Sequence, residues 1–489
     1  MHSDSVHSPL DLMKEFQGPI AGEHALAEYE GWWEREGKAI SSAHDRAGTP
    51  WLQMFDVFGK RVDDVQCAPE YWSMLRKGFK TGVIWRAFKE ASLLSSFRIG
   101  YICSFYDAGL FCPYTVSLST ILPLSKYGAE TVKASVLPKM LREDDSVWQG
   151  ATWMTEAGGG SDLGRYVETT ARPVGDGWTL TGDKYFTSNA IADVAVVAAR
   201  PEGAAAGVRG LALFLVPKRR ADGSLNFHIR RIKDKIATRS VITGEIELRD
   251  SEAHRLGQPE HGIYHILEVL NCSRVCNAIG SVGLMQRALA DAVTFASNRV
   301  AFGKPIAEHP LLKQQIKERL ELLEAAHALA WESVLLYDAV WRETPPYSDR
   351  FNLFRMIVHL AKYWTAEQAV QTAKWCMEVH GGMGTLAEFG VERWLREAMI
   401  LAIWEGPPHR QILDGIEAME RKGAHRLLFE HLAPGADAHE LWEVVRRVEA
   451  HLTLPADERE AGAEPVFRDL AQFAGKALAA KHRLSISRG

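Results

Sequence analysis

Glu405 lies in the run Ile403-Trp404-Glu405-Gly406-Pro407, which combines apolar side chains with a glycine. A carboxylate in an apolar setting holds a raised pKa, and a neighbouring glycine lets it reach a substrate. A base that removes a proton from carbon at neutral pH needs both properties. Because a Glu-Gly pair alone is usually a turn, the prediction of a catalytic base depends on three other segments.

The first of these segments is glycine-rich and runs from Met154 to Asp162, with three consecutive glycines at its centre. Glycines allow the backbone to approach a flat or anionic ligand closely. Thr155 and Ser161 add hydroxyl donors on either side of the glycines. Taken alone, the segment could equally be an ordinary turn.

The second segment, Gly182 to Ala190, carries Phe186 and the hydroxyls of Thr187 and Ser188 at the end of a predicted strand. An aromatic ring with adjacent hydroxyls could form one wall of a site for an aromatic cofactor. The alternative is a plain strand with a polar end.

The third segment holds Arg274, the glycines of Gly280–Gly283, and the run Arg299–Pro305. Arg299 and Phe302 lie three residues apart at the end of a predicted helix. An arginine there can hold a pyrophosphate while an aromatic ring covers a purine. The alternative is an arginine favoured by the helix dipole, with Phe302 in the core.

Upstream of Glu405, the stretch from Glu378 contains His380-Gly381-Gly382, a turn that would expose backbone donors. No Gly-x-Gly-x-x-Gly follows a strand, and no Walker-type loop, nucleophile elbow or zinc-ligand spacing is present. The sequence therefore argues against a standard Rossmann or P-loop site and predicts no metal. His327 is interpreted as a hydrogen-bonded core histidine rather than a ligand.

The elements that must position these residues change type along the chain. From Ser8 to Asp145 the apolar spacing is helical, and strand-like runs follow from Val147 to about residue 255, opening with a hairpin over residues 169–181. Helical spacing returns from Gly262. We predict a mainly α fold with a central β domain, divided into an N-terminal helical domain (1–146), a β domain (147–255), a helical bundle (256–431) and an added helical tail (432–489).

Composition narrows the setting of the protein. The 489 residues are 46% hydrophobic and carry a net charge of -5, which gives no reason to expect nucleic acid or an anionic membrane as partner. None of the six cysteines forms a Cys-x-x-Cys pair, and the N-terminus does not read as an export signal. The apolar runs are too short to span a bilayer. We expect a cytoplasmic protein.

Together the four segments resemble the acyl-CoA dehydrogenase family from about Leu110 to Met419, in order and at plausible spacing. The resemblance implies a helical N-terminal domain, a β-barrel middle domain and a C-terminal four-helix bundle. It implies FAD between the β domain, the bundle and a neighbouring subunit of a homotetramer or homodimer. It also implies an acyl-CoA substrate, an electron-transferring flavoprotein as electron acceptor, and a role in fatty acid metabolism.

The same resemblance assigns roles to single residues. Thr155 matches the threonine that bonds the flavin ring, Ser188 the hydroxyl near flavin N5, and Glu405 the base that removes the α-proton. Ser161 matches the serine near the pantetheine chain or the FAD phosphates. Another subgroup carries its base at the position of Ser273, which cannot act as one. The expected FAD contacts are Met154, Thr155, Ser161, Phe186, Ser188, Arg299, Phe302, Glu378, Gly381 and Gly382, and the expected substrate contacts are Ser161, Arg274, Trp404 and Gly406.

The sequence departs from the family pattern in two ways, and these departures leave functions other than acyl-CoA dehydrogenation open for this protein. The family often has Tyr-Glu-Gly-Thr where this chain has Trp404-Glu405-Gly406-Pro407, so a threonine contact to FAD is lost. Trp404 and the extra C-terminal helices are more similar to the branch of the alkylation-damage-response flavoprotein, with its proposed DNA-binding tail. Residues 431–489, however, hold nine acidic and eight basic side chains, which does not favour DNA contact. A same-fold oxidase or monooxygenase, and a damage-response flavoprotein with weak dehydrogenase activity, stay open as alternatives.

Overall fold

The computed structural model describes residues 5–486, and its chain forms two compact units. Unit 1 comprises Met1–Trp33, Gly100–Ala108 and Arg274–Gly489, and unit 2 comprises Glu34–Ile99 and Gly109–Ser273. Each unit therefore joins segments that are far apart in the sequence. Within the described residues, no helix is both long and apolar enough to cross a membrane.

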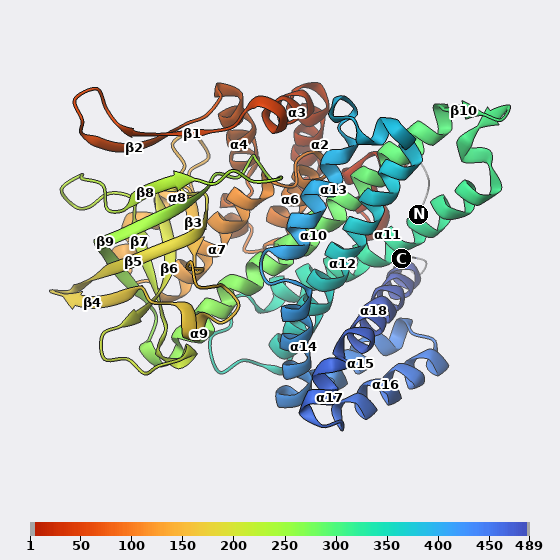
Figure 1. The fold of residues 1–489 in the computed structure, drawn as a ribbon. Coiled ribbons are helices and arrows are strands. Elements are labelled where there is room, and N and C mark those ends of the chain that lie inside the picture. Colours follow the sequence, from red (N-terminus) through yellow and green to blue (C-terminus); the bar gives the residue numbers. More distant parts are fainter. Residues whose placement is uncertain (1–4, 487–489) are drawn as a thin grey trace. The chain divides into compact units, whose positions relative to one another are not determined.

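Unit 2 is built around a seven-stranded sheet (Figure 1). The strand order is β3-β6-β4-β5-β9-β7, and β8 pairs with β9. Because β6 also pairs with β7, the sheet closes on itself. The predicted β domain and its first hairpin are confirmed, with Val174 facing Gly177 across the turn. The strands are β3 (Gly150–Trp153), β4 (Thr170–Val174), β5 (Gly177–Ser188), β6 (Val194–Pro201), β7 (Ala212–Pro217), β8 (His228–Ile232) and β9 (Thr243–Leu256).

Helices flank this sheet, and α7 packs against β3, where the Gly150 N–H donates to Ser117 Oγ at 3.0 Å. A Cβ on Gly150 would lie 2.6 Å from the Thr120 side chain, so the strand approaches the helix closely because this residue is glycine. The helices are α3 (Lys38–Ala47), α4 (Pro69–Thr81), α5 (Trp85–Lys89), α7 (Phe111–Tyr127), α8 (Glu130–Met140) and α9 (Leu163–Tyr166).

The prediction that residues 8–145 are helical throughout is wrong over residues 51–66, which form an antiparallel hairpin of β1 (Trp51–Phe55) and β2 (Arg61–Gln66). The Asp56 carboxylate closes the turn, because it accepts the N–H groups of Phe58 and Lys60, both at 2.9 Å. The buried Asp63 carboxylate accepts the Ile229 N–H at 3.0 Å and so ties the hairpin to β8.

Unit 1 consists of long packed helices, and α11 and α12 pack along each other. Helix α10 begins in unit 2 and ends in unit 1, as α6 does at its own boundary. The helices are α1 (Pro9–Gln17), α2 (Glu23–Trp32), α6 (Leu94–Tyr106), α10 (Gly262–Asn298), α11 (Pro310–Val340), α12 (Asp349–His380), α13 (Val391–Ile403), α14 (Pro408–Lys422), α15 (Ala424–Leu432), α16 (Ala438–Leu452), α17 (Ala456–Ala461) and α18 (Ala463–Ile486). A short hairpin joins β10 (Val300–Ala301) to β11 (Lys304–Pro305).

Short helical turns connect these elements. The 3-10 turns are η1 (Ser5–His7), η3 (Val208–Gly210), η4 (Pro259–His261), η5 (Ile306–Glu308), η6 (Gly381–Thr385), η7 (Ala387–Phe389) and η8 (Ala433–Gly435), and η2 (Trp33–Gly37) is a π-helical turn.

The added C-terminal helices, drawn in blue in Figure 1, pack onto the bundle rather than extending from it. Helix α18 packs against α11, α12 and α14. At its contact with α14, a Cβ on Gly415 would lie 2.3 Å from the Phe467 ring, so glycine allows the close approach. The helical character predicted for the C-terminal tail is confirmed by α16 and α18.

His327 occupies the core as expected, with its ring 4.3 Å from that of Phe16 and 5.5 Å from that of Tyr101. The prediction that His327 is hydrogen-bonded is wrong, because neither ring nitrogen has a partner among the described residues. Burial lowers the pKa of His327 to about 3, so the ring is neutral at physiological pH.

Candidate functional site

Glu405 lies in the turn between α13 and α14, and its backbone is left-handed at φ 59°. Such a conformation is uncommon for a residue other than glycine and often marks a functional position. Gly406 follows at φ 100°, and a Cβ there would lie 2.6 Å from Gln411 Nε2. Glu405 and Gly406 thus form a tight turn with a defined backbone conformation. Pro407 and Pro408 then direct the chain into α14.

Buried donors hold the carbonyl groups of this turn. The Glu405 carbonyl accepts from Gln411 Nε2 at 2.9 Å and from Arg274 Nε at 3.3 Å. The Gly406 carbonyl accepts from Lys362 Nζ at 2.8 Å and from Gln411 Nε2 at 3.1 Å. The Glu405 carboxylate, in contrast, has no hydrogen bond or ion pair within residues 5–486. The backbone of the turn is fixed, and the carboxylate is free to meet a ligand.

Burial raises the pKa of Glu405 to about 7, although the positive charges of Arg274 and Lys362 oppose the shift. A carboxyl group with this pKa is about half ionised at neutral pH. It can therefore accept a proton there and still holds it well enough to drive the transfer. The raised pKa expected from the apolar sequence around Glu405 is confirmed.

Arg274, an expected substrate contact, is buried and forms an ion pair with Asp414 at 3.1 Å in addition to its bond to the Glu405 carbonyl. It therefore contacts the turn that carries the predicted base. Trp404, another expected substrate contact, has a buried indole N–H with no acceptor among the described residues. Arg274, Trp404, Glu405 and Gly406 thus come together in one place in unit 1.

The expected flavin-ring contacts come together in unit 2. The Thr155 carbonyl accepts the Tyr185 N–H at 3.0 Å, which places the glycine-rich segment beside the end of β5. A register shift between Lys184 and Thr187 turns Phe186 outward, so that 55% of its surface is exposed while Thr187 is buried. No described residue bonds the hydroxyls of Thr155, Ser161 or Ser188. An exposed aromatic face beside free hydroxyls fits a flat, polar-edged ring such as a flavin.

A buried ion pair supports this segment from within the sheet. Lys184 Nζ lies 2.6 Å from Glu156 Oε1 and also donates to the carbonyls of Ala198 at 2.8 Å and Met154 at 3.4 Å. Glu156 further accepts from Thr169 Oγ1 at 2.6 Å. Burial lowers the pKa of Lys184, with Glu156 opposing the shift. Glu156 lies in the glycine-rich segment from Met154 to Asp162, and Lys184 lies in the segment from Gly182 to Ala190. A charged residue within each segment was the sequence feature that could have predicted the ion pair.

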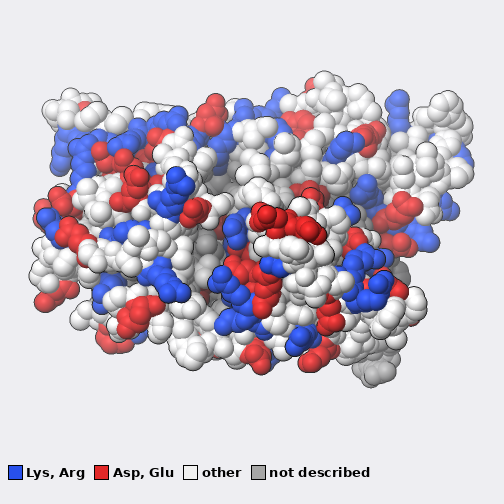
Figure 2. Space-filling view, turned by 60° about the horizontal axis from the view of Figure 1, so that its bottom comes forward, with Lys and Arg blue, Asp and Glu red and all other residues white. Residues whose placement is uncertain are grey.

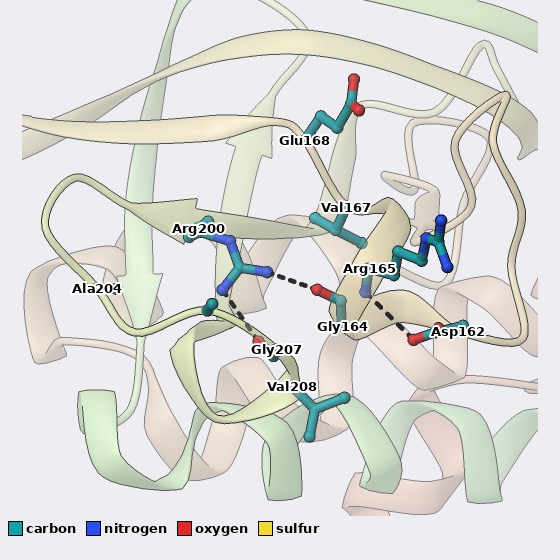
Figure 3. A pocket seen from close by; sticks show the side chains of 10 residues that line it. Asp162, Gly164, Arg165, Val167, Glu168, Arg200, Ala204, Gly207 and Val208 are labelled. Atoms are coloured by element: carbon teal, nitrogen blue, oxygen red, sulfur yellow. Dashed lines mark hydrogen bonds between the residues drawn. The ribbon is translucent and has the colours of Figure 1, made fainter.

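Next to Ser161, the β domain has a hollow of about 800 Å³ (Figure 3). Asp162 caps α9 by accepting the Arg165 N–H at 3.2 Å. The Arg200 guanidinium donates to the carbonyls of Gly164 at 2.9 Å and Gly207 at 2.9 Å, so it shapes the wall. Asp162, which lines the hollow, directly follows Ser161, the residue that the resemblance assigns to the substrate's carrier arm.

The remaining expected FAD contacts lie at the ends of α10 and α12 in unit 1. The rings of Phe295 and His380 are 4.3 Å apart and join these two ends. Gly381 ends α12 at φ 59°, and a side chain at Gly381 or Gly382 would meet only open space. Glu378 pairs with Lys374 one turn earlier. The turn therefore leaves room for a ligand above its backbone.

The position of Phe302 rules out the alternative interpretation that its ring lies in the core. Arg299 follows the last residue of α10 as expected, but Phe302 lies beyond it in the turn between β10 and β11. It is 97% exposed, so it is not a core residue.

Sequence reasoning missed Lys362, His359 and Gln411, which surround the Glu405 turn. The His359 Nδ1 donates to Gln411 Oε1 at 3.0 Å and orients the amide toward the turn. The sequence feature that could have identified them is the presence of His359 and Lys362 in an otherwise apolar stretch of α12. Polar groups on a buried helix need hydrogen-bond partners, so these two residues pointed to a polar contact.

Comparisons with known proteins agree with this arrangement. Residues 8–145 match the adaptive response protein AidB N-terminal domain, residues 151–251 the acyl-CoA dehydrogenase middle domain, and residues 260–419 the acyl-CoA dehydrogenase C-terminal domain. Acyl-CoA dehydrogenase family member 11 of Caenorhabditis elegans is 30% identical over 397 residues, which cover 76% of this chain and 63% of the relative, less than two thirds of its length.

Putative acyl-CoA dehydrogenase AidB of Escherichia coli K12 is 28% identical over 437 residues, 84% of this chain and 76% of that protein. The crystal structure of Caenorhabditis elegans ACDH-11 in complex with C11-CoA superposes with a TM-score of 0.83 at 24% identity, covering 98% of this chain and 87% of that one, and so shares its fold. With three matched domains in order and a glutamate presented on a glycine turn, the chain belongs to the acyl-CoA dehydrogenase family of FAD-dependent oxidoreductases.

Proposed function

We propose that this protein catalyses the α,β-dehydrogenation of an acyl-CoA to the trans-2-enoyl thioester, with Glu405 as the base. The observation that carries the proposal is Glu405 itself: a carboxylate with a pKa of about 7 and no internal partner, on a turn whose backbone is fixed. FAD, when bound, supplies the acceptor for the β-hydride. The other relevant groups belong to the chain.

Glu405 would remove the α-proton, which is a poor acid in water. Negative charge then develops on the thioester oxygen, and a correctly placed donor is worth about 3 kcal/mol in such a site. The Glu405 N–H has no acceptor among the described residues, so it is available to donate to that oxygen. One residue can thus provide both the base and a donor to the developing enolate.

The chain offers residues to hold both ligands. Thr155, Ser188 and Phe186 would bind the flavin ring, while Arg299 and Phe302 would bind the pyrophosphate and adenine of FAD. In the family this second pair serves a neighbouring subunit, so we propose a homotetramer or homodimer. The hollow beside Ser161 is proposed to accept the carrier arm, and the C11-CoA complex of ACDH-11 supports coenzyme A as that carrier. We propose an electron-transferring flavoprotein as acceptor, a cytoplasmic location, and the four-domain division given above.

The test is an anaerobic titration of the purified protein with saturated acyl-CoAs of increasing chain length, followed by flavin absorbance. We expect at least one acyl-CoA to bleach the flavin and the enoyl-CoA product to appear in equal amount. FAD-loaded protein that no acyl-CoA bleaches would contradict the proposal.

A second candidate, a damage-response flavoprotein with weak dehydrogenase activity, is motivated by the match of residues 8–145 to the AidB N-terminal domain. On the face drawn in Figure 2, acidic and basic side chains are intermixed, so this face is not the basic surface that DNA contact needs. Binding to duplex DNA that weakens steeply with salt would support it, and no binding at low salt would dismiss it. Rapid reoxidation of the reduced protein by air would instead favour an oxidase or monooxygenase.

Replacing Phe302 with alanine should weaken FAD binding without unfolding the protein. An aromatic contact of this kind contributes about 0.5–1.5 kcal/mol, so we expect the FAD dissociation constant to rise about two- to tenfold. Phe58→Ala is the matched control, because Phe58 is 91% exposed on a different hairpin. Ultrafiltration followed by flavin fluorescence measures retained FAD, and equal retention in the two variants would remove Phe302 from the FAD site.

A further inference from the structure

Lys362 is the most completely buried cation near the Glu405 turn. Its side chain lies on α12 with no exposed surface. Its ammonium donates to the Ala402 carbonyl at 2.8 Å and to the Gly406 carbonyl at 2.8 Å. These two carbonyls stand on either side of Trp404 and Glu405, so one side chain holds both ends of the turn.

Holding the turn does not by itself require a charge. Gln411 already donates to the Glu405 and Gly406 carbonyls as a neutral amide. Burying an ammonium costs free energy that a neutral donor avoids. Lys362 contributes what Gln411 does not, a positive charge close enough to Glu405 that each shifts the pKa of the other.

The electrostatic surroundings of the pair are mixed. Burial lowers the pKa of Lys362 to about 7, with Glu405 opposing that shift. His359 stays neutral, since burial lowers its pKa to about 3. Besides each other, the charged groups that act on the pair are Arg274 from α10 and Glu367 from α12. Arg274 in turn interacts with Asp414 from α14 and with Arg355 from α12.

We propose that Lys362 is a positioning residue of the reaction, which fixes the turn that presents Glu405 and places a positive charge beside that turn. The inference rests on the proposed role of Glu405 as base. A cation at this place favours the ionised carboxylate, so the base is ready at lower pH than burial alone would allow. Gln411 shares the structural task and not the electrostatic one.

The sign of the expected effect follows from the charge. Lys362→Met removes the cation and leaves the desolvation of Glu405 in place, so the pKa of Glu405 rises above its present value. A nearby opposite charge shifts a carboxyl pKa by about 1–3 units, and the Lys362 ammonium is held 2.8 Å from the carbonyl of Gly406, the residue next to Glu405. A rise of about one unit lowers the ionised fraction of Glu405 at pH 7 about fivefold. The loss is recovered at higher pH.

The experiment measures the rate of flavin bleaching as a function of pH, using the straight-chain acyl-CoA that bleaches the wild type fastest in the titration above. We expect Lys362→Met to move the midpoint of the acid limb upward by about one unit or more. Gln411→Leu should lower the rate at every pH and leave the midpoint in place. Lys317→Met, an exposed lysine on α11, should match the wild type.

A readout without turnover is infrared difference spectroscopy, in which we expect the wild type to show a carboxylic-acid stretch that Glu405→Gln lacks. The pH at which this band disappears should rise in Lys362→Met by the same amount as the kinetic midpoint. Circular dichroism and FAD content establish that the variants fold, and Lys362→Gln provides the same test if the methionine variant does not.

The outcomes separate the two proposals. If no acyl-CoA bleaches the wild type, the proposed function fails. If the wild type is bleached but the midpoint of Lys362→Met and the infrared band stay within about 0.3 unit of the wild type, only the role of Lys362 fails. A shift of equal size in Gln411→Leu would also overturn that role, because it would trace the change to the backbone of the turn.

Discussion

Glu405→Gln abolishes acyl-CoA-dependent flavin bleaching, while FAD content stays at the wild-type value and the melting temperature does not fall. Glutamine has nearly the size and shape of glutamate but cannot accept the α-proton. General-base catalysis contributes about 10²–10⁴-fold, and removal of a carbon-bound proton depends on it strongly, so we expect a loss of about 10³-fold or more. The measurement is the single-turnover bleaching rate in a stopped-flow instrument.

The stability of this variant should not fall, because the carboxylate has no internal partner to lose. The folded state also holds Glu405 with a raised pKa, so ionising it above about pH 4.5 costs folding free energy. That cost grows as the pH rises toward 7, and the glutamine variant avoids it. Glu417→Gln, on the outer side of α14, is the matched control. Full bleaching by Glu405→Gln would remove Glu405 from its assigned role.

Lys184→Met should be the most destabilising substitution among the residues considered. Lys184 has no exposed surface and Glu156 is 8% exposed, so the substitution leaves a buried carboxylate without its cation. Breaking a buried pair in this way typically costs about 3–5 kcal/mol. The measurement is the free energy of unfolding from urea denaturation, together with retained FAD, since the pair supports Met154 and Thr155.

The double variant Glu156→Gln/Lys184→Met is the control for this prediction. It removes both charges, so it should recover a large part of the stability lost in Lys184→Met. The pH dependence gives an independent check. Contacts led by Lys184 keep the pKa of Glu156 below its usual 4.5 despite burial, so its stabilising contribution is present above that pH and is lost as the pH falls through the lower value. A double variant as unstable as the single one would show that the ion pair is not the cause.

The sequence predicted the parts of the structure that depend on local pattern. The strands β4 to β9 and the helices α11, α12, α16 and α18 follow from periodicity and turn residues. The hairpin of β1 and β2 did not, because two strands of five and six residues within a helical region give a weak period-two signal. Its stability depends on Asp63 meeting β8, a contact made across 166 residues.

The same division holds within the site. Glu405 could be identified because the chemistry lies in consecutive residues, Trp404 to Pro407. The groups that hold it could not, since Arg274 reaches the turn from 131 residues away and Lys362 from 44 residues away. Folding alone brings these donors to the carbonyls of the turn, and no local pattern encodes which carbonyl each donor finds.

The pairing of β5 along both of its sides also constrains evolution at the proposed flavin wall. Strand β5 has hydrogen-bonded neighbours along both of its sides, β4 and β9. A slip by one position would turn the outward side chains inward and would have to break both ladders together. Insertions and deletions within β5 should therefore be selected against in homologues, whereas the loops between strands can change length without reorienting Phe186.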